Sequence, residues 1–83
     1  MKLTKQDYQA VLDTYLDTQE NLADGYKIIL FLRADDEDSA SIDIEEDVFH
    51  TVFRHKWQEG DTADTFRASF AQRIAAHPEL FKA

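Results

Sequence analysis

The sequence predicts a small α+β domain in which helices pack against an antiparallel β-hairpin. Three observations indicate this class. The N-terminal segment carries apolar residues at helical spacing, the middle combines a continuous apolar run with an alternating segment, and the C-terminal half returns to helical spacing. At 83 residues the chain is expected to form a single acidic globular domain, residues 1–83, with the order helix, strand, strand, helix, helix (α-β-β-α-α).

The first helix is predicted over about residues 5–19. Thr4 is a suitable N-cap and Asp7 follows three residues later, close to the capping-box pattern. One apolar stripe then runs along the segment at alternating spacings of three and four: Tyr8, Val11, Leu12, Tyr15 and Leu16. Gly25 is expected to close the turn that follows.

Two strands are predicted in the middle of the chain. The run Tyr26 to Arg33 (YKIILFLR) is apolar and short, which favours a strand over a helix. Ala40, Ile42 and Ile44 then alternate with polar residues, the period of a strand with one buried face. The polar stretch between the two segments is expected to form the loop of an antiparallel hairpin. Because a two-stranded ribbon is not stable alone, helices must cover it.

Two further helices are predicted after the hairpin. The second would begin at the cap pair Asp43 and Glu46 and end at Gly60, with its apolar stripe at Val48, Phe49, Val52, Phe53 and Trp57. The third would begin at Asp61 or Thr62, end before Pro78, and present Ala63, Phe66, Phe70 and Ile74 to the core. The short connection between them predicts an antiparallel pair. Leu80 and Phe81 are expected to fold back onto the core.

Composition excludes several classes of protein. The chain has no cysteine, which removes disulfide scaffolds, thiolate zinc sites and cysteine nucleophiles. No apolar run approaches the roughly 18 residues that a membrane span needs, and the N-terminus lacks the layout of a signal peptide. A cytoplasmic location is therefore expected. The 9 Lys and Arg against 17 Asp and Glu give a net charge of −8, which argues against direct binding to nucleic acid or to an anionic membrane.

The sequence offers no catalytic constellation. It lacks the phosphate-binding glycine loops, the zinc-protease helix motif and the nucleophile elbow. His50 and His55 are five residues apart, unlike paired metal ligands on a helix, and are expected on the surface of the second helix. Asp13 and Asp17 are expected to belong to a solvated helix face. We therefore predict a protein that is not an enzyme and has no cofactor and no metal site.

The distribution of charge is the one feature that departs from background. No Lys or Arg occurs between Arg33 and Arg54, and this stretch holds eight of the 17 acidic residues. They are Asp35, Asp36, Glu37, Asp38, Asp43, Glu45, Glu46 and Asp47. A dense acidic patch attracts a basic partner and speeds encounter, and carboxylates can occupy a groove that otherwise binds phosphates. These eight residues are the predicted partner-binding site, and all are expected to be solvated.

The predicted function is that of a non-enzymatic, acidic protein-binding domain. We expect an inhibitor or DNA mimic of the kind that phages and mobile elements direct against defence proteins, or an immunity protein for a toxin. Its partner would be a basic nucleic-acid-binding protein such as a nuclease. A simpler interpretation stays open, in which the acids only solubilise a loop and stabilise a helix start.

Two alternative functions stay open as well. The first is an adaptor or oligomerisation module, because Ile29 and Phe31 lie on one face of the predicted first strand and Ile28 and Leu30 on the other. Pairing with a second copy in a homodimer, or with a strand of a partner, would cover the exposed hairpin. The second is a degenerate EF-hand-like calcium site over residues 35–46. It lacks the glycine of the sharp turn, having Ala40 there, and requires the run before it to be helical.

Overall fold

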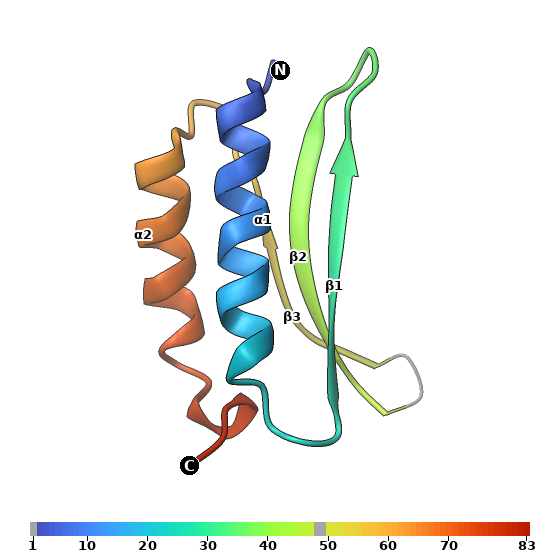
Figure 1. The fold of residues 1–83 in the computed structure, drawn as a ribbon, viewed down its shortest axis with the longest axis vertical. Helices are drawn as coiled ribbons and strands as arrows, with labels where there is room; N and C mark the ends of the chain where they lie inside the picture. Colours follow the sequence, from blue (N-terminus) through green and yellow to red (C-terminus); the bar gives the residue numbers. More distant parts are fainter. Residues whose placement is uncertain (1, 48–49) are drawn as a thin grey trace.

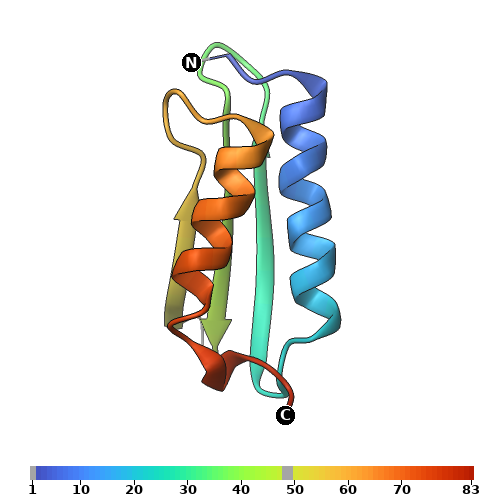
Figure 2. The ribbon, with the colours of Figure 1, turned by 90° about the vertical axis from the view of Figure 1, so that its left-hand side faces the viewer.

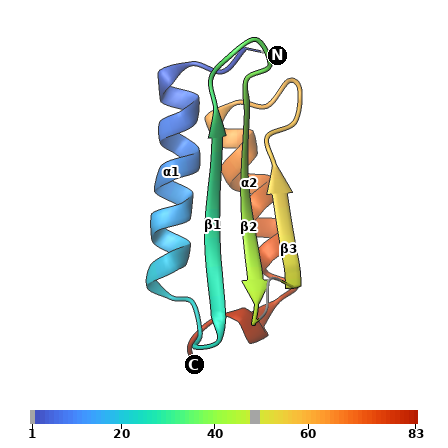
Figure 3. The ribbon, with the colours of Figure 1, turned by 90° about the vertical axis from the view of Figure 1, so that its right-hand side faces the viewer.

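The computed structural model of the chain describes residues 2–47 and 50–83, and it has two layers (Figure 1). Its elements in chain order are α1 (Lys5–Glu20), β1 (Tyr26–Arg33), β2 (Ser39–Glu46), β3 (His50–Lys56), α2 (Ala63–Ile74) and a 3₁₀ turn (Pro78–Leu80). The strands form one antiparallel sheet in the order β1-β2-β3, and both helices lie on the same face of it (Figures 2 and 3). The α+β class and the antiparallel hairpin are confirmed.

The prediction of a second helix is wrong, because that segment forms strand β3. The order is therefore helix, strand, strand, strand, helix. Phe53, His55 and Trp57 are buried and alternate with exposed residues, as in a strand with one covered face. The predicted stripe members Val48 and Phe49 lie outside the described residues.

Packing explains why this segment is a strand. Phe53 lies opposite Ile44 in the β2–β3 ladder, and its ring packs edge-on against Phe70 of α2 with 5.6 Å between the centroids. Trp57 stacks on Phe66 of the same helix at 5.4 Å. A strand at this position pairs the second edge of β2 and places both rings against α2, and these tertiary contacts outweigh a helical pattern in the local sequence.

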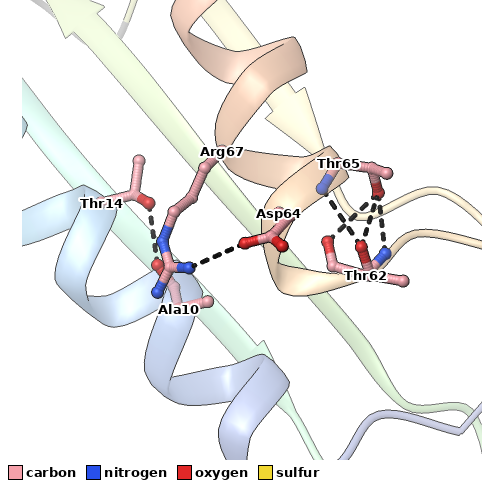
Figure 4. Close-up of polar contacts among 6 residues, drawn as sticks. All are labelled: Ala10, Thr14, Thr62, Asp64, Thr65 and Arg67. Carbon is pink, nitrogen blue, oxygen red and sulfur yellow. Dashed lines mark hydrogen bonds and ion pairs between the residues drawn. The ribbon is translucent and has the colours of Figure 1, made fainter.

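Both helices begin at the caps that the sequence predicts. Thr4 and Asp7 form a capping box at the start of α1, and Thr62 forms one with Thr65 at the start of α2 (Figure 4). In the first turn of α2, Asp64 also pairs with Arg67 at 3.7 Å. Within residues 2–47 and 50–83, no helix has the length and apolar character needed to cross a membrane.

The core lies between the sheet and the two helices. The central strand contributes Ala40, Ile42 and Ile44, which are buried against Val11 of α1 and Phe66 of α2. This is the face of β2 that its alternating pattern predicts. The opposite face of the sheet carries no helix among the residues that the structure describes (Figure 3).

The C-terminal tail closes the end of the core, as the sequence predicts. Leu80 is 1% exposed, and its carbonyl accepts a hydrogen bond from the backbone N–H of Ala23 at 2.8 Å. The Lys82 N–H donates to the Asn21 carbonyl at 2.9 Å. These two bonds attach the tail to the turn between α1 and β1, where Gly25 adopts a φ of 93°.

Candidate protein-binding surface

The structure does not bring the eight predicted binding residues together. Asp35 to Asp38 lie in the loop between β1 and β2, whereas Glu45 to Asp47 lie at the far end of β2. At about 3.3 Å per residue, this strand of eight residues separates the two groups by about 23 Å. Asp43 lies between them within the strand. Figure 1 shows the loop and the far end of β2 at opposite ends of the sheet.

Two of the eight residues are buried, so the prediction that all are solvated is wrong. Asp38 is 6% exposed and Asp43 is 1% exposed. The Oδ2 of Asp38 accepts a hydrogen bond from the backbone N–H of Leu3 at 3.1 Å. This bond joins the hairpin loop to the segment before α1, so Asp38 has a structural role.

Asp43 does not cap a helix, because it lies in the middle of the central strand. It is opposite Ile29 of β1 and Arg54 of β3, on the face of the sheet without helices. Arg54 donates from Nε to both carboxylate oxygens at 3.0 Å and from Nη2 to Oδ2 at 2.7 Å. A paired and hydrogen-bonded carboxylate is tolerated at such a position. Asp43 and Arg54 therefore form a cross-strand ion pair rather than a free charge.

We call the exposed residues near the turn of the hairpin the hairpin tip: Phe31, Leu32, Asp35, Asp36 and Glu37. The strand register places Phe31 on the uncovered face of the sheet and Leu32 on the helix face. Phe31 is 51% exposed and Leu32 is 45% exposed, although both are large apolar residues. Leu16 of α1 is the third exposed large apolar residue among the described residues. Two of the three thus lie beside the acidic loop.

Hydrogen bonds order the loop of the hairpin tip. The Arg33 Nε donates to Oδ2 of Asp35 at 2.7 Å, and the backbone N–H of Glu37 donates to Oδ1 of Asp35 at 2.9 Å. These two bonds, the one from Arg33 first, lower the pKa of Asp35. Asp35 therefore stays ionised while it holds the turn.

Tyr8 of α1 borders the hairpin tip. Its hydroxyl donates to the backbone carbonyl of Arg33 at 2.5 Å, at the end of β1. Partial burial, followed by the negative charges of Asp38 and Asp35, raises the pKa of Tyr8. The sequence assigns Tyr8 to the core; the side chain packs against the core but its hydroxyl reaches this end of the sheet.

The uncovered face of the sheet carries an unexpected share of the basic residues. The strand register places Lys27, Arg33, Arg54 and Lys56 on this face. Arg54 is paired with Asp43, and Arg33 with Asp35. Half of this positive charge is thus neutralised locally, which makes the face a poor phosphate-binding surface.

His55 lies in a buried polar cluster, not on a helix surface as predicted. It is 4% exposed on β3, where its Nδ1 lies 2.9 Å from Arg73 Nη1 and its Nε2 lies 3.0 Å from Ser69 Oγ. Because an arginine can only donate, Nδ1 accepts, and the proton is on Nε2 and is donated to Ser69. The Ser69 hydroxyl in turn donates to the Phe66 carbonyl at 3.1 Å.

This arrangement is unsuited to activating the serine as a nucleophile. A general base must accept the proton of the hydroxyl, whereas the His55 Nε2 donates to it. Burial and the neighbouring charge of Arg73 lower the pKa of His55, with a smaller opposite effect from Asp61. The cluster fastens α2 to β3. The spacing of Phe53, His55 and Trp57 was the sequence signal that could have placed His55 inside.

An EF-hand interpretation of residues 35–46 is wrong for this fold. Such a loop needs a helix on each side, but it is preceded by strand β1 and its own second half is strand β2. Among the residues that the structure describes, no group of three or more histidine and acidic side chains is placed to hold a metal ion.

Comparison with known proteins gives no relative. No family model matches the chain, and no curated protein or solved structure matches it either.

Proposed function

We propose that the chain is a non-enzymatic protein-binding domain that docks through its hairpin tip on a basic, nucleic-acid-binding protein. In this role it acts as an inhibitor or nucleic-acid mimic in the cytoplasm, of the kind used in anti-defence or toxin-immunity systems. The observation that carries the proposal is the position of Phe31 and Leu32, both exposed, beside the carboxylates of Asp35, Asp36 and Glu37.

The two kinds of side chain have different tasks in such a contact. Exposed carboxylates accelerate encounter with a basic surface through long-range attraction. Buried apolar contact then slows dissociation, and large side chains contribute most of it. A loop that only improves solubility needs charges but gains nothing from an exposed phenylalanine and leucine next to them. The combination therefore favours a docking surface over a solvated turn.

The docking surface is smaller than the eight-residue site that the sequence predicts. Asp38 and Asp43 are engaged inside the fold, and the far end of β2 is too distant to join the hairpin tip. Asp35, Asp36 and Glu37 supply the charge of the proposed contact.

The test is displacement of a labelled DNA duplex from a panel of purified basic DNA-binding proteins and nucleases. Wild type is compared with the triple variant Asp35→Asn/Asp36→Asn/Glu37→Gln. The matched control Asp17→Asn/Asp64→Asn/Glu79→Gln removes the same charge from exposed positions on α1, α2 and the C-terminal 3₁₀ turn. We expect wild type to displace DNA from at least one target, and the tip variant to associate about tenfold more slowly.

The control variant distinguishes a local surface from net charge. It should keep the association rate within about twofold of wild type, because its charges lie away from the contact. Equal losses in the two triple variants would mean that net charge alone acts, and would refute the hairpin tip as the docking surface. Absence of displacement from every target would refute the inhibitor role.

A further inference from the structure

The two edges of the sheet differ in how they are protected against pairing. Strand β1 is eight residues long, pairs with β2 without a bulge, and has five consecutive apolar residues from Ile28 to Leu32. Natural edge strands are normally guarded by charges, prolines or bulges in the middle. The charged residues of β1, Lys27 and Arg33, lie near its ends, so its middle is unguarded.

Strand β3 has features that protect an edge strand against pairing and that β1 lacks. A register shift interrupts its ladder with β2 between Ile44 and Glu45. Arg54 and Lys56 place charge along it. In addition, the Arg73 side chain of α2 donates a hydrogen bond to the backbone carbonyl of Arg54. Only one of the two edges is therefore suited to receive another strand.

The helix layer extends beyond β1. Figures 2 and 3 show α2 over the β2–β3 side of the sheet and α1 displaced past the β1 edge. Neighbouring helix axes lie about 8–10 Å apart, which is about twice the strand spacing of about 4.8 Å. Two helices side by side thus cover about four strands, but the sheet has three. The position left over lies beside β1, beneath α1.

The face of α1 toward this position is partly apolar. Tyr8 at its start reaches the carbonyl of Arg33, and Gln19 at its end lines a hollow of about 490 Å³ with residues 22–29. Helical periodicity places Leu12 and Tyr15 on the same face, between these two residues. An added strand beside β1 would lie against this face.

Charge and space argue against a second copy of this chain as the occupant. Each copy carries a net charge of −8. Antiparallel pairing of two β1 strands about Leu30 would place Lys27 of one copy opposite Arg33 of the other, and like charges directly opposite each other destabilise a sheet. Both copies would also bring an overhanging α1 to the same side of the joint sheet.

Charge instead favours a basic segment. Asp35, Asp36 and Glu37 lie beyond one end of β1, and Glu20 and Asp24 precede the other end. We propose that β1 receives an extended segment of the partner as a fourth strand, with apolar residues at alternate positions and Lys or Arg on either side of the paired stretch, beyond the positions opposite Lys27 and Arg33. This inference rests on the basic partner of the proposed function and adds the mode by which it binds.

The test uses a synthetic peptide of alternating valine and threonine with two lysines at each end. Its binding to ¹⁵N-labelled protein is followed by amide chemical shifts and hydrogen exchange. We expect sub-millimolar binding, shifts concentrated in β1, and slowed exchange of those β1 amides that do not already pair with β2. The same peptide with prolines at two central positions should bind at least about tenfold more weakly, because proline removes ladder donors.

A pair of protein variants tests the role of α1. Gln19→Lys places a positive charge on the helix face beside β1 and should weaken peptide binding at least about fivefold. Gln72→Lys adds the same charge to an exposed position of α2 and should leave binding unchanged. Equal binding of the proline peptide, shifts confined to the uncovered sheet face, or absence of sub-millimolar binding would each overturn the inference.

The two proposals fail separately. Peptide binding along β1 without DNA displacement would retain the strand-receiving edge and refute the inhibitor role. DNA displacement by a complex in which the exchange of β1 amides is unchanged would retain the inhibitor role and refute the strand addition.

Discussion

The ionisable side chains that the fold encloses and those of the hairpin tip are of similar chemical types but have opposite tasks. Asp38, Asp43 and His55 are each less than 7% exposed and each bonds to a group on another segment of the chain. Asp36 and Glu37 are exposed in a loop. The number of acidic residues in a stretch of sequence therefore does not give the charge of an exposed surface, because some of the carboxylates are buried and bond to groups within the fold.

The largest expected effect on stability is at Asp43. In Asp43→Asn the ion pair is lost and the buried amide satisfies Arg54 less well, so we expect the free energy of unfolding to fall by about 1–2 kcal/mol. The value is below that of a fully buried pair because the Arg54 side chain is 54% exposed and can be hydrated. Urea denaturation measures it. A change below about 0.3 kcal/mol would mean that Asp43 contributes as little to stability as the residues of the hairpin tip.

Asp38 should show a smaller effect. Asp38→Ala leaves the buried N–H of Leu3 without its acceptor, at a cost of about 1 kcal/mol, whereas Asp38→Asn keeps an acceptor oxygen and should cost less. Denaturant midpoints of the two variants provide the comparison. If both variants lost equal stability, the charge rather than the hydrogen bond would be responsible.

The buried His55 should make the free energy of unfolding depend on pH. Its pKa is lowered in the folded state, so the unfolded chain binds a proton that the folded chain does not. Stability should therefore fall as the pH decreases below the unfolded value of about 6.5, by at most about 1.4 kcal/mol per pH unit for one proton. The lowered pKa of Asp35 acts in a separate window, since its contribution is lost only below about pH 4. Denaturation from pH 8 to 5, repeated with His55→Gln, isolates the contribution of His55 to this pH dependence.

The smallest expected effect is at the hairpin tip. Asp36→Asn/Glu37→Gln should change the free energy of unfolding by no more than about 0.5 kcal/mol, because both side chains are exposed. Thermal unfolding at two salt concentrations tests this. A loss above about 1 kcal/mol would show that these carboxylates also support the fold, and the contrast with Asp43 would disappear.

Local signals explain the parts of the fold that the sequence predicts. Thr4 and Thr62 start helices by bonding to residues three positions away, and the alternation of Ala40, Ile42 and Ile44 needs no distant partner to be interpreted. Strand β3 was missed for the opposite reason. Its period-two pattern depends on counting His55 as an inside residue, and His55 is inside because Ser69 and Arg73 satisfy its nitrogens.

The same dependence limits what could be predicted of the site. Asp43 occupies a polar position in the alternating pattern of β2, and such a position indicates exposure. Its burial depends on Arg54, which lies in a segment that the sequence pattern assigned to a helix. The exposure of Phe31 likewise follows from the arrangement of the layers, because Phe31 lies on the sheet face without helices. Such facts belong to the assembled layers and not to any one segment.

The order of strands in the sheet has a consequence for the rate at which the domain forms. Each strand pairs with its neighbour in sequence, so the sheet can assemble from two short loop closures. The contact of α1 with α2 closes a much longer stretch of chain. Because folding rates fall as the sequence separation of contacts rises, we expect the strands to pair early and the docking of α1 against α2 to be the slower step in refolding.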